Sequence, residues 1–348
     1  MDKIISESIS VFLNSSSLFI TGGTGFFGRS LLRRISEVNT LSPLRKYAVT
    51  VLSRNPEAFL AQYPEFSHEP WLCIVRGDIL SNLESVDRLE THYSHIIHAA
   101  ADSTVGPAMP FLERHDQIVV GTRNILDFAV KVGAKRFLLT SSGGAYGVQP
   151  ATIEKIPEIY LGMPDPLGAA NTYSVSKRMA EHLCSLYANK YGLEIVVARC
   201  FAFVGPDLPL DAHFAIGNFI GDALKGLPIS IKGNGSPLRS YLYQSDLADW
   251  LLTLVNRGSS GDAYNVGSDK AISILELANL VRSSLDSNVE IHVQNNQLAD
   301  NKERNRYIPN IDKIQQDLGV RVSVPLSQAI KLTAQHFRNS SSQVHSNV

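Results

Sequence analysis

The sequence predicts an α/β protein, a doubly wound parallel sheet accompanied by a smaller, discontinuous α/β domain. Three observations support this prediction. An apolar segment runs directly into glycines at Gly22, Gly25 and Gly28, and a helix-like pattern follows them. Strand-like and helix-like runs then alternate over the first half of the chain, as they do when helices connect parallel strands. The alternation ends after Pro206, which predicts a different folding pattern beyond that point.

The three glycines form a turn suited to a dinucleotide. Gly22 permits a sharp turn off the strand, Gly25 removes a Cβ where phosphates must approach, and Gly28 lets the next helix pack on the sheet. A pyrophosphate binds at such a turn because backbone N–H groups at a helix N-terminus point toward it. The sequence therefore predicts a dinucleotide site that includes Gly22, Gly25, Phe26, Phe27 and Gly28.

The remaining elements follow from hydrophobic periodicity. Further strands are expected at residues 47–52, 72–76, 95–100, 137–141 and 194–200, and helices at 119–132, 174–191, 214–224 and 246–255. A short strand at 263–266 is expected to return to the main sheet. The main domain is therefore predicted at 14–204 plus about 245–266, the smaller domain at 205–244 and 267–337, and a disordered polar tail at 338–348.

Composition and net charge limit the partners and the cellular location that the sequence predicts. The 348 residues are 44% hydrophobic and 19% charged, with a formal net charge of −1. This balance gives no electrostatic reason to expect nucleic acid or an anionic membrane as partner. No apolar run reaches the roughly 18 residues that span a bilayer. Cys73, Cys184 and Cys200 lie far apart among apolar neighbours, which predicts buried free thiols and a cytoplasmic protein.

Histidines cluster around the expected fourth strand without a metal-binding pattern. His92, His95 and His98 have neither a helical i, i+4 partner nor a carboxylate-rich motif nearby. Metal sites combine such ligands at defined spacings. The sequence therefore predicts ordinary strand and loop histidines and no metal site.

Tyr173 and Lys177 are the candidate catalytic pair. Their spacing of four residues puts both side chains on one helix face. A free tyrosine has a pKa near ~10, and a neighbouring ammonium group together with a nicotinamide ring is expected to lower it. Ser142 ends the fifth expected strand, where its hydroxyl can bond the same substrate oxygen. A tyrosine and a lysine at this spacing also occur by chance as structural residues, so the pair gains weight from its context.

The residues after the second strand bear on the choice of cofactor. Ser53 and Arg54 stand where an acidic residue would favour NAD, and a hydroxyl with a guanidinium suits a 2′-phosphate. NADP is therefore favoured and NAD remains possible, because the alternative for Arg54 is a solvated surface arginine. The predicted cofactor site also includes Asp78 and Ile79 near adenine, Ala99, Ala100 and Ala101 beside the cofactor, and Tyr173, Lys177 and Val204.

Over residues 16–335 the chain resembles the extended short-chain dehydrogenase/reductases, the nucleotide-sugar epimerase and dehydratase group. The motifs that carry the resemblance are residues 21–28 (TGGTGFFG), 98–101 (HAAA), 141–147 (SSGGAYG), 173–177 (YSVSK) and 239–243 (RSYLY) with Asp246. The resemblance implies a Rossmann-type domain for NAD(P), a smaller domain that binds a nucleoside-diphosphate sugar, and a homodimer.

The resemblance also implies roles for individual residues. Ser142, Tyr173 and Lys177 match the family's catalytic trio. Arg239 matches an arginine that binds the substrate diphosphate, as a guanidinium does well, although a surface salt bridge is its alternative. Arg304, Arg306 and Tyr307 loosely match a late phosphate-binding segment. The predicted substrate site consists of Ser103, Thr104, Ser142, Gly143, His213, Arg239, Arg304, Arg306 and Tyr307.

Departures from the family pattern narrow the reaction. Dehydrating members carry an acidic pair directly after the catalytic hydroxyl and decarboxylating members a glutamate, whereas this chain has Gly143 and Gly144. The reactions that remain need only hydride and proton transfer. The favoured reaction is reduction of a 4-keto sugar, with 4-epimerisation as the alternative. A 4,6-dehydratase is the third and less favoured alternative. It stays open because the Asp102 carboxylate can substitute as a base. A non-catalytic NADP-binding regulator is the alternative from another class.

Overall fold

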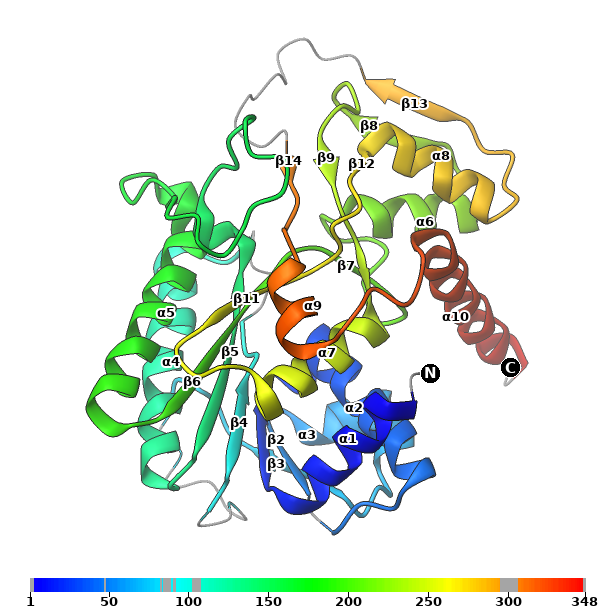
Figure 1. Cartoon of the computed structure of the whole chain (residues 1–348). Helices are drawn as coiled ribbons and strands as arrows, with labels where there is room; N and C mark the ends of the chain where they lie inside the picture. The colour runs from blue at the N-terminus through cyan, green and yellow to red at the C-terminus, as the bar shows by residue number, and fades with distance from the viewer. Residues whose placement is uncertain are drawn as a thin grey trace.

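A seven-stranded parallel sheet forms the centre of the molecule (Figure 1). The computed structural model describes residues 3–46, 48–81, 83, 89, 92–101, 108–294 and 306–346. The strands are β1 (Leu18–Thr21), β2 (Val49–Ser53), β3 (Leu72–Arg76), β4 (His95–His98), β5 (Arg136–Ser142), β6 (Glu194–Cys200) and β11 (Ala263–Val266). The predicted doubly wound α/β fold is confirmed.

The strand order is β11-β6-β5-β4-β1-β2-β3. The chain winds outward from β1 through β2 to β3 and then returns to the other side of β1 at β4. Ligands of open parallel sheets bind at such a reversal, outside the carboxyl ends of the strands. Gly22 follows β1 and Ala99 follows β4, so both residues lie at this point. The short strand at residues 263–266 joins β6 and extends the main sheet.

Helices cover both faces of the sheet (Figure 1). One face carries α4 (Phe111–Lys131) and α5 (Thr172–Tyr191), and the other carries α1 (Lys3–Ser15), α2 (Phe26–Leu41) and α7 (Gln244–Arg257). Successive side chains of β1 point to opposite faces of the sheet. Phe19 packs in the core under α4 and α5, and Ile20 packs in the core under α2 and α7. Both are fully buried, and each such side chain contributes roughly 1.5–3 kcal/mol.

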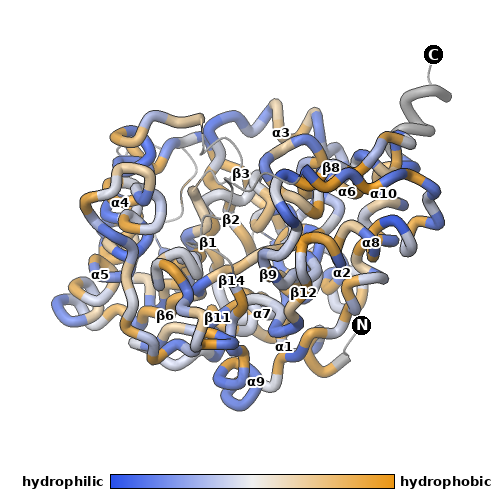
Figure 2. The backbone as a smooth tube through the Cα atoms, turned by 90° about the horizontal axis from the view of Figure 1, so that it is seen from above, coloured by the Kyte–Doolittle hydropathy of each residue, from blue (hydrophilic) through white to orange (hydrophobic). Residues whose placement is uncertain are grey.

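Hydropathy along the chain follows this layering. Figure 2 shows hydrophobic colour on the central strands, whereas the outer helices α4 and α5 alternate between hydrophilic and hydrophobic segments.

The short helix α3 (Pro56–Gln62) follows β2 and is capped by Asn55, whose side chain accepts a bond from the Ala58 amide. Within the described residues, no helix combines the length and apolar character that crossing a bilayer requires.

The second part of the molecule packs α6 (Ala215–Lys225), α8 (Ile274–Ser284) and α10 (Leu326–Ser346) around their own core. Among the described residues, three small sheets accompany these helices: β7 (Phe203–Val204) with β10 (Leu242–Tyr243), β8 (Ile229–Lys232) with β13 (Ile291–Gln294), and β12 (Ile272–Ser273) with β9 (Leu238–Arg239) and β14 (Arg306–Tyr307). The helix α9 (Asp312–Leu318) contacts β11 of the main sheet.

The C-terminal segment differs from expectation. A disordered tail was predicted from residue 338, but α10 continues to Ser346. The first half of α10 buries Ala329, Ile330 and Ala334 in the second core. Once packing has fixed those turns, each further helical residue adds a hydrogen bond at small cost, so the polar end extends the same helix. Cys184 and Cys200 are buried free thiols as predicted, whereas Cys73 is half-buried.

Candidate active site

A cavity of about 1050 Å³ opens at the carboxyl ends of the strands, between the main sheet and the second part of the molecule. The sequence-predicted residues that line it are Gly22, Gly25, Phe26, Phe27, Ser53, Arg54, Asp78, Ile79, Ala99, Ala100, Ala101, Ser142, Tyr173, Lys177, His213, Arg239, Arg306 and Tyr307. Segments far apart in the sequence therefore meet at one site.

The glycine turn has the geometry that its sequence predicts. Gly22 has a φ of +70°, and a Cβ there would lie 2.5 Å from the carbonyl oxygen of Ala99. A Cβ on Gly28 would lie 2.2 Å from the backbone of Gly23, so Gly28 serves helix packing and does not line the cavity. Gly25 caps α2 by backbone alone, without a side-chain hydrogen bond among the described residues. The N-terminus of α2 thus offers its amides to the cavity, as an anion site does.

An ion-pair cluster joins the glycine turn to the second part of the molecule. Arg29 donates from Nη1 to the Thr24 carbonyl at 2.8 Å and from Nε to Asp207 Oδ1 at 2.9 Å. Arg33 and Gln244 also donate to the Asp207 carboxylate, at 3.1 and 2.5 Å. The Asp207 side chain is only 2% exposed, so its charge depends on these partners.

The residues after β2 and β3 form the outer end of the cavity. Ser53 is buried and accepts a bond from the Asn55 amide at 3.2 Å, while Arg54 is exposed at the cavity edge. Arg76 donates to the Arg54 carbonyl at 3.0 Å and pairs with Glu57. Arg76 therefore braces the backbone that carries the Arg54 guanidinium.

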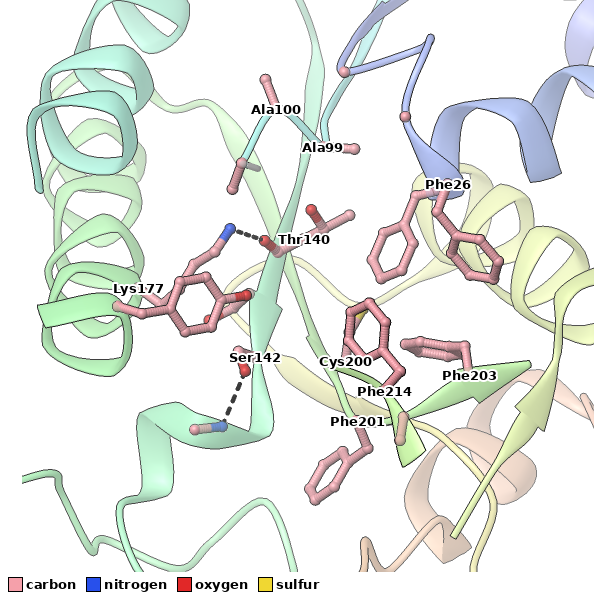
Figure 3. Close-up of a pocket in the computed structure, with 18 of the residues that line it drawn as sticks. Phe26, Ala99, Ala100, Thr140, Ser142, Lys177, Cys200, Phe201, Phe203 and Phe214 are labelled. Atoms are coloured by element: carbon pink, nitrogen blue, oxygen red, sulfur yellow. Dashed lines mark hydrogen bonds between the residues drawn. The ribbon is translucent and has the colours of Figure 1, made fainter. Parts of the chain in front are cut away.

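The catalytic candidates gather at the inner end, on β5 and α5. Lys177 Nζ donates to the Thr140 carbonyl at 2.8 Å, and Ser142 Oγ accepts from the Gly144 amide at 3.1 Å (Figure 3). Lys177 is 4% exposed, and burial lowers its pKa to about 8. The ammonium group lies 5.9 Å from the centre of the Tyr173 ring. The predicted trio is thus brought together.

Burial has the largest effect of the protein on the Tyr173 pKa. Lys177 together with a nicotinamide ring was expected to lower this pKa, and within the protein itself burial raises it above its usual value. A hydrogen bond with Ser142 and the charge of Arg114 act in the opposite direction. Burial dominates because the phenolate loses water that the partners only partly replace.

Arg114 is a site residue that sequence reasoning missed. It lies in the first turns of α4, lines the cavity, and places its guanidinium carbon 4.6 Å from the centre of the Tyr173 ring. Nothing in the local pattern around residue 114 distinguishes it from a surface arginine of a helix. Its position depends on how α4 packs against α5.

Two paired strands of the second part carry the predicted substrate residues. Tyr307 of β14 lies beside Arg239 of β9 in register. Arg306 donates to the Glu154 carbonyl at 3.3 Å. The His213 and Phe214 rings pack against each other at a tilt of 37° with their centres 4.2 Å apart, and both side chains line the cavity. Ser103, Thr104 and Arg304 lie outside the described residues.

Aromatic side chains fill the space beside Ser142. A Cβ on Gly143 would lie 2.7 Å from the Phe201 ring and 2.8 Å from the Tyr307 hydroxyl. The Tyr307 hydroxyl lies 3.5 Å from Ser142 Oγ, and its ring packs against Phe201 at 4.6 Å. Phe26, Phe203 and Phe214 lie across the cavity from Lys177 and Ser142 (Figure 3).

Two residues predicted to contact a ligand do not line the cavity. Val204 was expected to touch the cofactor, but it is fully buried in the second core and does not line the cavity. Its β7 strand pairs with β10, and this pairing turns Val204 inward. Gly143 does not line the cavity either, because Phe201 and Tyr307 cover it.

His98 is an ordinary strand residue that forms hydrogen bonds with Thr21 and Thr122, and burial lowers its pKa to about 3.

Known proteins share this fold and sequence pattern. Residues 18–267 match the NAD dependent epimerase/dehydratase family. The chain is 30% identical over 328 residues to UDP-glucuronic acid decarboxylase 3 of Arabidopsis thaliana, which covers 92% of this chain and 89% of that protein. Its fold is similar to UDP-glucose 4-epimerase of Thermotoga maritima with UDP-glucose (TM-score 0.77, 21% identity, 93% and 99% covered). It is also similar to RMD of Pseudomonas aeruginosa complexed with NADPH (TM-score 0.74, 23% identity, 93% and 99% covered).

These similarities confirm the resemblance on which the site residues were assigned. The family match includes the glycine turn, Ser142, Tyr173 and Lys177, and the decarboxylase relative extends it over the second part of the molecule. Because the match covers most of the chain, the chain belongs to the NAD dependent epimerase/dehydratase family.

Proposed function

We propose that this protein is an NADP-preferring oxidoreductase that reduces the C4 keto group of a nucleoside-diphosphate sugar. One observation carries the proposal: Ser142, Tyr173 and Lys177 line the cavity together, while a Cβ at the adjoining Gly143 would lie 2.7 Å from the Phe201 ring. Ketone reduction requires a hydride on the carbonyl carbon and a proton on its oxygen, and it does not require a carboxylate at the position after Ser142.

The residues around the glycine turn fit a nicotinamide dinucleotide. A Cβ at Gly22 would collide with Ala99, and the uncapped start of α2 provides amides for a pyrophosphate. When bound, the reduced dinucleotide supplies the hydride. Arg54 and Ser53 favour a 2′-phosphate, because a guanidinium pairs with phosphate oxygens. NAD is the alternative, in keeping with the name of the family.

Each catalytic side chain has a separate task in this proposal. Tyr173 gives its phenolic proton to the oxygen at C4 of the sugar, and Ser142 donates a hydrogen bond to the same oxygen. Lys177, held by the Thr140 carbonyl, keeps a positive charge beside the phenol. Arg239 and Arg306, which also line the cavity, bind the substrate diphosphate.

A 4-epimerase is the second candidate function. The same three side chains serve oxidation at C4 followed by hydride return to the other face, with no net use of cofactor. Decarboxylation and dehydration are less well supported, although the relative named above is a decarboxylase. The enzymes that the family pattern associates with those reactions use acidic residues after Ser142. Here the two positions are glycines, with Phe201 and Tyr307 beside Gly143 and Ser174 beside Gly144.

Coenzyme consumption tests the proposal. The purified protein is mixed with NADPH or NADH and with 4-keto sugars linked to UDP, dTDP, GDP or CDP, and products are identified by mass. A reductase oxidises one coenzyme per product, whereas an epimerase interconverts two sugar nucleotides without net oxidation. Tyr173→Phe is expected to abolish turnover, and Arg239→Ala to raise the KM of the sugar nucleotide but not of the coenzyme. Release of carbon dioxide from UDP-glucuronate would overturn the proposal, and full biological output from Tyr173→Phe would favour the regulator.

The proposed active form is a homodimer. The packed pair α4 and α5 leaves large apolar side chains exposed, with Leu112 at 80%, Leu186 at 50% and Met179 at 43%. A second copy that covers this surface would remove it from water. Light scattering at several concentrations tests the proposal, and Leu186→Glu together with Met179→Glu is expected to give monomers.

A further inference from the structure

We propose that Arg114 is a positioning residue for Tyr173, whose guanidinium lies over the phenol ring and stabilises the phenolate. This inference rests on the proposed function, because it assigns the proton chemistry to Tyr173. The guanidinium carbon is 4.6 Å from the ring centre, whereas the Lys177 nitrogen is 5.9 Å away. Arg114 and Tyr173 both line the cavity that the proposed function assigns to the coenzyme and the substrate.

The start of α4 is held in place against α5. His115, the next residue, is 3.1 Å from the Ser176 hydroxyl, and Ser176 is fully buried. The Arg114 amide donates to the Pro110 carbonyl at 3.0 Å, which is the first helical bond of α4. Because α4 and α5 pack closely along their length, the arginine and the tyrosine approach each other from two fixed helices.

Lys177 is poorly placed to supply this charge alone. Its ammonium group donates to the Thr140 carbonyl at 2.8 Å, which directs it toward β5. Burial lowers the Lys177 pKa to about 8, so the lysine loses its charge as the pH rises through that value. A guanidinium keeps its charge over the whole range in which a phenol titrates. Arg114 therefore still stabilises the phenolate above about pH 8, where Lys177 has lost its charge.

The other groups around Tyr173 do not replace this charge. Ser142 of β5 offers a neutral hydroxyl, and burial raises the pKa of the Cys200 thiol of β6 to about 12, which keeps it neutral. His213 faces the same cavity, and burial and Arg114 lower its pKa, so it is neutral at physiological pH. Glu181 of α5, which acts on Lys177, is paired with Arg199 at 2.7 Å.

The positive charge of Arg114 determines the direction in which it shifts the Tyr173 pKa. A cation beside the ring favours the phenolate and makes the phenol a stronger acid. In reduction Tyr173 gives up its proton, so Arg114 raises the rate of that step. In the reverse oxidation Tyr173 must be a phenolate, and Arg114 raises the fraction of enzyme in that form at a given pH.

Direct titration of Tyr173 tests the inference without turnover. Protein labelled with carbon-13 at the tyrosine ring carbon that bears the hydroxyl is titrated by NMR with oxidised coenzyme bound. The Tyr173 signal is the one missing from Tyr173→Phe. Arg114→Gln is expected to raise the Tyr173 pKa by about one pH unit, since an opposite charge at 4–6 Å lowers a pKa by roughly 1–3 units. Arg114→Lys is expected to restore part of the difference.

Arg123→Gln is the matched control. Arg123 lies on the same helix, is exposed and pairs with Asp127, so its loss removes the same charge away from the cavity. Its titration is expected to equal the wild type. Circular dichroism of each variant checks that the helices are intact.

Two outcomes would overturn the inference. One is an unchanged Tyr173 pKa in folded Arg114→Gln. The other is a raised KM for the sugar nucleotide with an unchanged pH profile of kcat, which would make Arg114 a ligand of the substrate. If no sugar nucleotide is turned over, the proposed function fails, while the NMR titration still decides the relation between Arg114 and Tyr173.

Discussion

Arg29 and Asp207 form a hydrogen-bonded ion pair, with 2.9 Å between Arg29 Nε and Asp207 Oδ1. The same arginine holds the Thr24 carbonyl inside the glycine turn. Asp207 lies in the segment that leads into the second part of the molecule, next to Leu208 and Pro209 of the cavity wall. The pair thus connects the predicted dinucleotide end of the cavity to the substrate end.

Asp207→Asn is expected to destabilise the fold by about 2 kcal/mol, below the roughly 3–5 kcal/mol for breaking a fully buried pair, because Arg29 and Arg33 keep partial contact with water. The free energy of unfolding from urea titration measures it. Glu65→Gln is the control, since Glu65 pairs with Arg33 at an exposed position and should cost at most ~1 kcal/mol. Equal effects of the two substitutions would contradict the prediction.

Arg54→Ala is expected to weaken NADP(H) binding by roughly 10- to 100-fold, because a charged hydrogen bond contributes ~1.5–3 kcal/mol and each ~1.4 kcal/mol is a factor of ten. NAD(H) binding should change little, since NAD has no 2′-phosphate. Isothermal titration with both coenzymes measures the ratio. Arg76→Gln, which removes only the brace behind Arg54, should have a smaller effect. An unchanged ratio in Arg54→Ala would show that the arginine is merely solvated.

Gly143→Ala is expected to destabilise the protein by ~1–3 kcal/mol and to reduce kcat, because the new methyl group overlaps the Phe201 ring and the Tyr307 hydroxyl. Thermal unfolding and steady-state kinetics measure the two effects. The double variant Gly143→Ala with Phe201→Leu makes room for the methyl group and should recover part of the stability lost through the overlap. A single variant as stable as the wild type would mean that the aromatic pair moves aside readily.

Lys177 gives a pH dependence of stability with a defined sign. Burial lowers its pKa from 10.5 to about 8 in the folded state. Between these values the unfolded lysine binds a proton and the folded one does not, so stability rises with pH across that window. Relative to Lys177→Met, the wild type should therefore gain stability from about pH 8 upward. Urea titrations of both proteins measure this, and parallel pH dependences would contradict it.

The local features of the chain were predictable because short-range physics decides them. The bounds of β3, β6 and β11 agree with the apolar runs at residues 72–76, 194–200 and 263–266. Gly22 and Gly28 have the conformation and the close contacts that their spacing predicts, since only glycine tolerates them. The pairing of Tyr173 with Lys177 follows from helix periodicity alone.

The surroundings of those residues depended on the tertiary structure. Arg114, Asp207 and Phe201 come from a helix, a linker and a strand end, and no local pattern marks any of them as part of the site. Val204 was assigned to the cofactor and lies in the second core, because strand pairing with β10 sets which way it faces. The burial that raises the Tyr173 pKa also arises only from the packed structure. The sequence alone thus determined the backbone turns and the identity of the reacting groups, whereas desolvation and contacts between distant segments exist only once the layers pack.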